Sequence, residues 1–311
     1  MRRLGVLAAL IALAGCGGSS NGDHDAATKR TVPGPLQVAN GPAQAADPGS
    51  RPLTLELDAV ADPLIVPFKQ PPRSGLLFDL DTGEVLWRRL PDRVLPIASL
   101  TKMMTALIVV QRERPTEKVR VTKEALAYQG SGVGLLPRGK WIGISTMLHG
   151  LLLPSGNDAA IALAQRAART VPRFVRLMNR KAKSLGLVCT RFSTPSGFLD
   201  KGNHSCASDL AAIARAVLRE PRLASIVRRR EARLPFPIKG GHLYLYNNNP
   251  LLRQGYPGTT GVKTGYTDAA GRCLVATARR GPIKLGVVLL HSPDPGTQAR
   301  QLLDRGFRAE S

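Results

Sequence analysis

The stretch PIASLTKMMTALIVV, residues 96–110, places one lysine in an otherwise largely apolar run. The run predicts a buried helix, in which Lys102 lies three residues after Ser99. Residues three apart share a helix face, so the Lys102 ammonium and the Ser99 hydroxyl are expected to touch. Because burying an unpaired ammonium is so unfavourable, a lysine at this position needs a structural or chemical reason.

Length and charge limit the possible classes of protein. The 311 residues are enough for one large domain or two small ones. The formal net charge of +22 favours a polyanionic neighbour, such as nucleic acid, anionic lipid or an acidic cell-wall polymer. The basic residues are scattered, and the densest run, residues 228–230, has no aromatic neighbour. We therefore expect a generally basic surface and no nucleic-acid partner.

The N-terminus, MRRLGVLAALIALAGC, indicates export. Two arginines, a short apolar stretch and small residues follow the order of a secretory signal, and the stretch is too short to span a bilayer. Residues 13–16 resemble the lipobox of bacterial lipoproteins, which implies cleavage before Cys16 and a lipid on its thiol. An ordinary cleaved signal with a chance cysteine is the alternative. Residues 1–15 are predicted to be the signal peptide and residues 16–66 a lipidated, disordered linker.

The other three cysteines fit an exported protein. Cys189 and Cys206 flank a loop rich in Gly, Ser, Asn and Pro, which a disulfide formed on export could close. Cys273, in the apolar run CLVATA, is predicted to be a buried strand residue. No Cys/His spacing indicates a metal site, so neither a metal nor another cofactor is expected.

Residues 67–311 are predicted to form one mixed α+β (α/β) domain. Its expected elements are a hairpin over 75–89, helices over 98–113, 145–153, 157–168, 171–186 and 206–218, three strands after residue 240, and a closing helix over 296–307. An N-terminal hairpin and a C-terminal meander, with helices between and after them, predict an antiparallel sheet flanked by helices plus a helical subdomain.

Three short motifs carry the chemistry. Ser99-Leu100-Thr101-Lys102 opens a helix, Ser155-Gly156-Asn157 lies between two helices, and Lys263-Thr264-Gly265 lies on a strand-like segment. Each alone has an ordinary explanation: a lysine that reaches solvent from a helix end, a turn with a helix cap, or a lysine on an edge strand. In this order and context, however, they form the signature of serine penicillin-recognising enzymes.

The chain closely resembles the D-alanyl-D-alanine carboxypeptidase family, the low-molecular-mass penicillin-binding proteins, over roughly residues 70–308. SLTKMMTAL, GLLLPSGNDAAIALA, TPSGF, NNNPLL and GVKTGYTDAAGRCLVATA look like family sequence in family order. The resemblance implies a DD-peptidase/β-lactamase-like fold. It also implies removal of the terminal D-Ala from peptidoglycan stem peptides through a serine acyl-enzyme, with β-lactams as covalent inhibitors.

The resemblance also assigns roles to residues. Ser99 would attack the peptide carbonyl and Lys102, kept neutral by burial and by Lys263, would take its proton. Ser155, between the two lysines, would relay a proton to the leaving amine, and Asn157 would hold the substrate and orient Lys102. At the C-terminal end of the substrate, the terminal carboxylate would bind Lys263 and Thr264, and Gly265 would admit the substrate backbone. The N–H groups of Ser99 and Tyr266 would form the oxyanion hole.

Three other functional interpretations of the sequence remain open. A DD-endopeptidase would cleave crosslinks with the same residues, and a class A β-lactamase would need a Glu-activated water. Glu220 mimics a fragment of the lactamase loop, but Ala224 replaces the expected asparagine and Pro221 more simply ends a helix. A catalytically silent wall-binding lipoprotein would have no need of Lys102.

The resemblance is incomplete near the C-terminus. Some family members bind the substrate carboxylate with an arginine beyond the last strand, and SPDPGT offers none there. With the lipobox, the predicted location is the cell envelope, with a lipid-anchored domain that faces the periplasm or cell wall.

Overall fold

The computed structural model describes residues 53–55, 57, 64–199, 201–238 and 241–310. The predicted signal peptide, Cys16 and most of the predicted linker lie outside the described residues. Leu53 and Leu55 pack against the hydrophobic core, and the Leu64 amide donates to the carbonyl of Leu86 at 3.1 Å. The chain therefore contacts the folded unit before the predicted boundary at residue 67.

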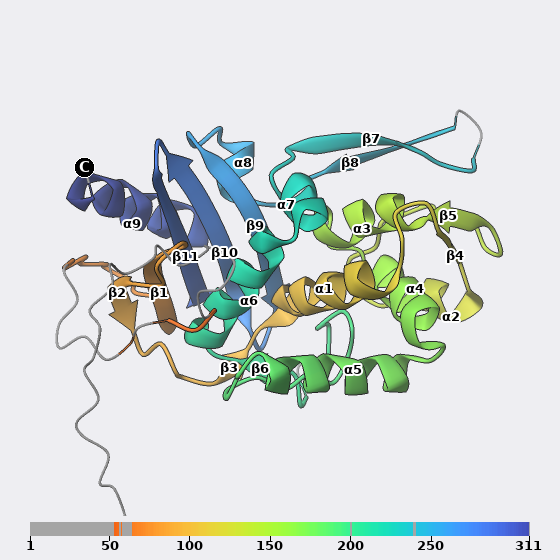
Figure 1. The fold of residues 1–311 in the computed structure, drawn as a ribbon, viewed down its shortest axis with the longest axis horizontal. Helices are drawn as coiled ribbons and strands as arrows, with labels where there is room; N and C mark the ends of the chain where they lie inside the picture. Colours follow the sequence, from red (N-terminus) through yellow and green to blue (C-terminus); the bar gives the residue numbers. More distant parts are fainter. Residues whose placement is uncertain (1–52, 56, 58–63, 200, 239–240, 311) are drawn as a thin grey trace, which may run out of the picture. The chain divides into compact units, whose positions relative to one another are not determined.

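A five-stranded antiparallel sheet, in the order β2-β1-β11-β10-β9, forms the centre of the fold (Figure 1). Its strands are β1 (Ser74–Asp79), β2 (Val85–Arg89), β9 (Thr259–Thr267), β10 (Gly271–Arg280) and β11 (Ile283–Ser292). Three two-stranded pairs complete the described strands: β3 (Leu95–Pro96) with β6 (His204–Ser205), β4 (Lys118–Arg120) with β5 (Trp141–Gly143), and β7 (Glu231–Pro235) with β8 (His242–Tyr246). The pairing of β1 with the C-terminal β11 joins the two ends of the domain.

Both faces of the central sheet are buried. Successive side chains of a strand point to opposite faces, and Leu77 packs in one apolar cluster whereas Leu76 and Phe78 pack in the other. Helix α9 (Pro295–Ala309) covers the Leu77 face, and α6 (Ala207–Arg219) covers the opposite face (Figure 1). Because both faces are buried, the sequences of β10 and β11 are nearly continuous apolar runs.

Six further described helices pack on the α6 side: α1 (Lys102–Arg112), α2 (Lys123–Leu126), α3 (Ile144–Leu152), α4 (Asn157–Ala168), α5 (Val171–Ser184) and α7 (Pro221–Val227). The short α8 (Pro250–Arg253) lies beside β9 and α9, and its Leu251 packs in the apolar cluster on the α9 face. The completely buried face of α1 contributes Met103, Met104 and Leu107 to the core that these helices share with the sheet. The 3-10 turn η1 (Ala98–Thr101), which leads into α1, packs against the edge strand β9 (Figure 1).

The prediction of a mixed α+β fold with an antiparallel sheet and a helical part is confirmed. The hairpin, the helices around residues 154–157 and the three C-terminal strands lie where the sequence predicts them. Pro221 ends the preceding helix, as expected, but also begins α7, whose N-cap is the Glu220 side chain. The β7–β8 hairpin was not predicted from the sequence.

A disulfide joins Cys189 and Cys206, whose Cα atoms are 5.6 Å apart. It closes the loop that precedes α6. Cys273 is buried on β10, as the sequence predicts. None of the helices in the described part of the chain is long and apolar enough to cross a membrane.

Candidate active site

Ser99 lies in a tight turn at the entrance to α1. The 3-10 turn η1 (Ala98–Thr101) leads directly into α1, and Thr101 Oγ1 donates to the carbonyl of Ala98 at 2.8 Å. Asn203 Nδ2 in turn donates to Thr101 Oγ1 at 2.8 Å. Ser99 therefore sits just before the α-helix, and not within it as the apolar run suggested, but its three-residue spacing from Lys102 still places the two side chains in contact.

Lys102 is completely buried and makes three polar contacts. Its Nζ lies 2.7 Å from Ser99 Oγ, 2.7 Å from Asn157 Oδ1 and 2.8 Å from the carbonyl oxygen of Ser196. Two of these partners, the amide and carbonyl oxygens, can only accept hydrogen bonds, whereas the Ser99 hydroxyl can donate or accept. A neutral amine has two N–H groups and one lone pair, so neutral Lys102 can satisfy both oxygens and accept the Ser99 proton.

The surroundings of Lys102 favour this neutral form. Desolvation by burial, and then the nearby positive charge of Lys263, hold the pKa of Lys102 well below its ordinary value, while Asp158 opposes the shift. The burial that looks unfavourable in the sequence is thus compensated by hydrogen bonds, and it makes the charged form of Lys102 less favourable.

Ser155 and Gly156 lie between α3 and α4, and Asn157 is the first residue of α4. Asn157 Oδ1 holds Lys102, and its Nδ2 donates to the carbonyl of Gln129 at 2.5 Å, which fixes the orientation of the amide. Ser155 is buried and has a positive φ of 72°. Its Oγ makes no hydrogen bond with any described residue, so it does not bridge the two lysines directly in this structure.

The Lys263–Gly265 motif lies on β9, as predicted. Lys263 is 1% exposed, its Nζ donates to the carbonyl of Thr264 at 2.9 Å, and burial lowers its pKa to about 7. Gly265 lets β9 approach η1 closely: a Cβ there would lie 3.0 Å from the carbonyl oxygen of Ile97 and 3.1 Å from the Ser99 nitrogen. The close approach brings the backbone beside Tyr266 near the Ser99 turn.

These motifs border a pocket of about 420 Å³. Ser99, Ser155, Thr264, Gly265 and Tyr266 line it, whereas the buried Lys102, Asn157 and Lys263 are not among the lining residues. Both serines and the β9 edge thus face the pocket, and the two lysines are buried outside its lining. A peptide strand in this pocket would meet the Ser99 hydroxyl and the edge of β9 together.

The sequence interpretation missed Arg272, which also lines the pocket. It lies opposite Tyr266 in the β9–β10 register, and its Nη1 donates to the carbonyl of Pro293 at 2.8 Å. Asp294 and Gln254 are further polar lining residues that were not predicted. Counting back from the turn between the two strands would have paired Arg272 with Tyr266, because hairpin register follows from the turn.

A serine held against a buried lysine whose pKa is lowered, beside an edge strand that can receive a peptide, is the arrangement of a serine acyl-transfer enzyme. The family model described as D-alanyl-D-alanine carboxypeptidase, Peptidase S11, matches residues 67–294. The chain belongs to this family.

Individual relatives agree with the family assignment. The carboxypeptidase DacF of Bacillus subtilis is 34% identical over 243 residues, which are 76% of this chain and 62% of DacF. A D-alanyl-D-alanine endopeptidase of Pseudomonas aeruginosa is 35% identical over 75% of this chain and 77% of its own length. The crystal structure of a D-alanyl-D-alanine carboxypeptidase from Mycobacterium tuberculosis H37Rv superposes with a TM-score of 0.74 at 33% identity, covering 80% of this chain and 96% of that chain.

Proposed function

We propose that this chain is a serine-type D-Ala-D-Ala carboxypeptidase that removes the terminal D-Ala from peptidoglycan stem peptides. The observation that carries the proposal is the set of contacts around Lys102 Nζ, which places a base 2.7 Å from the Ser99 hydroxyl. The chain spans only about three fifths of the length of DacF, so the activity of that whole protein is not transferred by similarity alone.

In the proposed reaction, Ser99 Oγ attacks the carbonyl carbon of the penultimate D-Ala while its proton passes to Lys102 Nζ. Collapse of the tetrahedral intermediate breaks the C–N bond, and the leaving D-Ala amine receives a proton from Lys102 by way of the Ser155 hydroxyl. Water then attacks the acyl-enzyme and restores Ser99. The buried Ser155 Oγ, which has no partner among the described residues, has hydrogen-bonding capacity available for the relay.

The oxyanion that forms during attack needs donors on one side of the carbonyl. We assign this role to the backbone N–H groups of Ser99 and Tyr266, as the family resemblance implies. The close approach of Gly265 to the Ser99 nitrogen supports the assignment, because it brings the two segments together.

The terminal carboxylate of the substrate would bind at the β9 edge. Thr264 offers a hydroxyl, and the buried Lys263 a positive charge close behind it. We assign a further role to Arg272, which supplies from β10 the guanidinium that the SPDPGT segment lacks. Asn157 is assigned chiefly to hold Lys102, since both ends of its amide are already engaged.

A DD-endopeptidase activity is the second candidate, favoured by the similarity to the Pseudomonas aeruginosa endopeptidase. A β-lactamase activity is less supported, because Glu220 caps α7 and is absent from the residues that line the pocket. A catalytically silent wall-binding protein would not need the three contacts of Lys102. β-lactams are accordingly expected to acylate Ser99 and persist there.

One comparison separates the two leading activities. The protein is given a soluble pentapeptide that ends in D-Ala-D-Ala and, separately, a crosslinked muropeptide dimer, and free D-Ala and monomer are quantified. Release of D-Ala with the dimer left intact supports the carboxypeptidase. Preferential cleavage of the dimer would replace it with the endopeptidase, and no reaction with either would reject both.

We also propose that the protein is an exported lipoprotein of the cell envelope, joined to the membrane through Cys16. The support is the N-terminal sequence pattern together with the substrate of the family, which lies outside the cytoplasm. Metabolic labelling with an alkyne fatty acid should mark the wild-type protein and leave Cys16→Ala unmarked. Equal labelling of both would reject this attachment site.

A further inference from the structure

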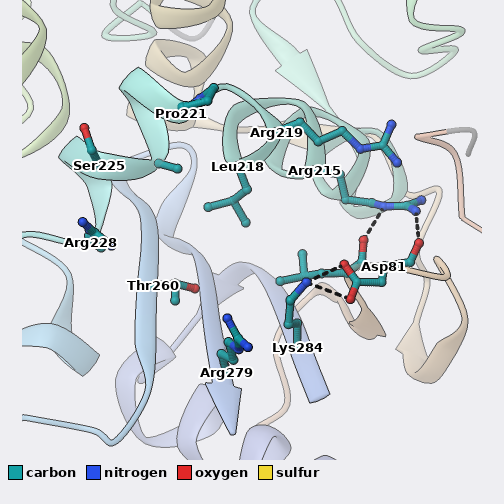
Figure 2. Close-up of a pocket in the computed structure, with 12 residues that line it drawn as sticks. Asp81, Arg215, Leu218, Arg219, Pro221, Ser225, Arg228, Thr260, Arg279 and Lys284 are labelled. Carbon is teal, nitrogen blue, oxygen red and sulfur yellow. Dashed lines mark hydrogen bonds and ion pairs between the residues drawn. The ribbon is translucent and has the colours of Figure 1, made fainter. Parts of the chain in front are cut away.

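A second pocket, distinct from the one beside Ser99, lies between helices α6 and α7 and strands β9 to β11 (Figure 2). Its volume is about 1020 Å³. None of its lining residues borders the pocket that contains Ser99 and Thr264. The proposed reaction gives this second pocket no role.

The charge of this pocket is strongly positive. Among its twelve lining residues only Asp81 is acidic, while the basic ones are Arg215, Arg219, Arg228, Arg279 and Lys284. Asp81 is neutralised locally, because its carboxylate forms an ion pair with Lys284 Nζ at 3.0 Å. The pocket as a whole therefore favours an anion.

Two of the guanidinium groups that line the pocket come from different elements, Arg228 from the end of α7 and Arg279 from β10. Arg228, the C-cap residue of α7, is exposed, and its side chain forms no hydrogen bond or ion pair with the described residues. Arg279, on β10, engages its Nε with the carbonyl of Gly281 at 2.8 Å. Guanidinium groups bind phosphate oxygens with paired hydrogen bonds, so phosphate is the anion that fits this arrangement best.

The rest of the lining is apolar. Leu80, Leu218, Pro221 and Ala224 contribute side chains between the basic groups. A fully hydrophilic polymer gains nothing from such a surface, whereas a molecule with both a phosphate and a hydrocarbon part gains from both. The lining thus favours an amphipathic phosphate over a wall polymer or a free phosphate ion.

The path of the chain also favours a membrane lipid as the ligand. Arg215, buried on α6, donates through Nη1 to the carbonyls of Leu53 and Thr54 at 2.9 and 3.0 Å, and through Nε to Leu80 at 2.9 Å (Figure 2 shows its contacts with the β1–β2 turn). Leu53 and Thr54 are therefore bound at the rim of this pocket. If Cys16 carries a lipid, this is the side of the domain to which the membrane tether is joined.

We propose that this pocket binds the headgroup of an anionic phospholipid, with its phosphate between Arg228 and Arg279 and its glycerol and first methylene groups on the apolar lining. The orientation toward the membrane rests on the proposed lipid anchor, whereas the binding itself does not. Docking through this pocket would hold the domain on the bilayer surface with the Ser99 pocket kept apart from the lipid site.

The test measures equilibrium binding of soluble dihexanoyl-phosphatidylglycerol, below its micelle concentration, to the purified full-length protein. The same titration is made with dihexanoyl-phosphatidylcholine and with inorganic phosphate. The double variant Arg228→Gln/Arg279→Gln should bind the anionic lipid roughly a hundredfold more weakly, about tenfold for each lost charged hydrogen-bonding group. The matched control, Arg176→Gln/Arg180→Gln on the exposed face of α5, removes the same charge and should bind as the wild type does.

Equal affinity of the wild type and the Arg228/Arg279 variant would overturn the proposal, as would an equal loss in the α5 control. Inorganic phosphate or the zwitterionic lipid binding as tightly as the anionic lipid would also overturn it. Penicillin labelling of Ser99 is followed in every sample. Lipid binding without penicillin labelling would reject the proposed enzyme activity and support this lipid site. Penicillin labelling without lipid binding would support the enzyme activity and reject the lipid site.

Discussion

At the scale of single residues, Lys102 is the proposed base for Ser99. Replacing it by alanine removes the proton acceptor 2.7 Å from Ser99 Oγ. We expect Lys102→Ala to slow acylation by penicillin roughly 10²- to 10⁴-fold, the usual contribution of a general base. Stopped-flow acylation rates, with circular dichroism as a check on folding, measure this. A folded variant that acylates at the wild-type rate would show that the lysine is structural.

The two buried lysines also predict a pH dependence. Lys102 must be neutral to act, so kcat/KM rises as pH increases through its lowered pKa. Burial lowers the pKa of Lys263 to about 7, so the positive charge near the substrate carboxylate is lost above that pH and kcat/KM falls. A pH–rate profile with a D-Ala-D-Ala peptide should therefore bend downward above about pH 7. Lys263→Gln should lose this alkaline bend, and a wild-type profile that still rises at pH 9 would contradict the assignment.

Arg272 gives a third prediction at this scale. If its guanidinium binds the substrate carboxylate, Arg272→Ala should raise KM for the peptide about tenfold or more and change kcat less. Arg272→Lys should restore part of the affinity, because the charge returns without the paired geometry. Unchanged KM in Arg272→Ala would assign this residue a structural role through Pro293 alone.

At the scale of elements, the loop over residues 194–198 supports the Ser99 turn. Gly197 has φ of 74°, and a Cβ there would lie 2.0 Å from the carbonyl oxygen of Ala98. Gly186 has a similar φ of 72°, but nothing lies within 4 Å of its Cβ position. Both glycines thus have a positive φ, but only Gly197 lacks space for a Cβ atom.

Alanine at each position therefore separates the two effects. Gly186→Ala should cost about 1–2 kcal/mol of unfolding free energy and leave acylation unchanged. Gly197→Ala should cost about 3 kcal/mol or more and also slow acylation, because the Ser99 turn must move. Urea unfolding and penicillin labelling measure both quantities. Equal effects of the two substitutions would show that the contact with Ala98 is unimportant.

The elements also show what the sequence could predict. The contact of Ser99 with Lys102 follows from local spacing, and the three motifs indicate the correct elements. The Ser196 carbonyl that completes the Lys102 site comes from a loop 94 residues away, and no local pattern gives that contact. The β7–β8 hairpin was missed because its second strand, HLYLY, exposes Tyr244 and Tyr246, so apolar side chains face outward as well as inward.

At the scale of the whole molecule, the Cys189–Cys206 disulfide closes a segment with a sequence separation of 17. A loop of this length should contribute about 3 kcal/mol to stability by restricting the unfolded chain. Urea unfolding of the oxidised protein, compared with the same protein kept reduced, measures the difference. The unfolding free energy of the double variant Cys189→Ala/Cys206→Ala should not change when reductant is added. Identical unfolding of the oxidised and reduced wild type would contradict this contribution.

The central claim for the molecule is that Ser99 forms a covalent acyl-enzyme. It is tested most directly by incubating the protein with benzylpenicillin and measuring its intact mass, followed by peptide mapping. We expect one added penicilloyl group, located on the peptide that contains Ser99, and none on Ser99→Ala. An unmodified wild-type protein, an adduct on another residue, or equal modification of Ser99→Ala would contradict it.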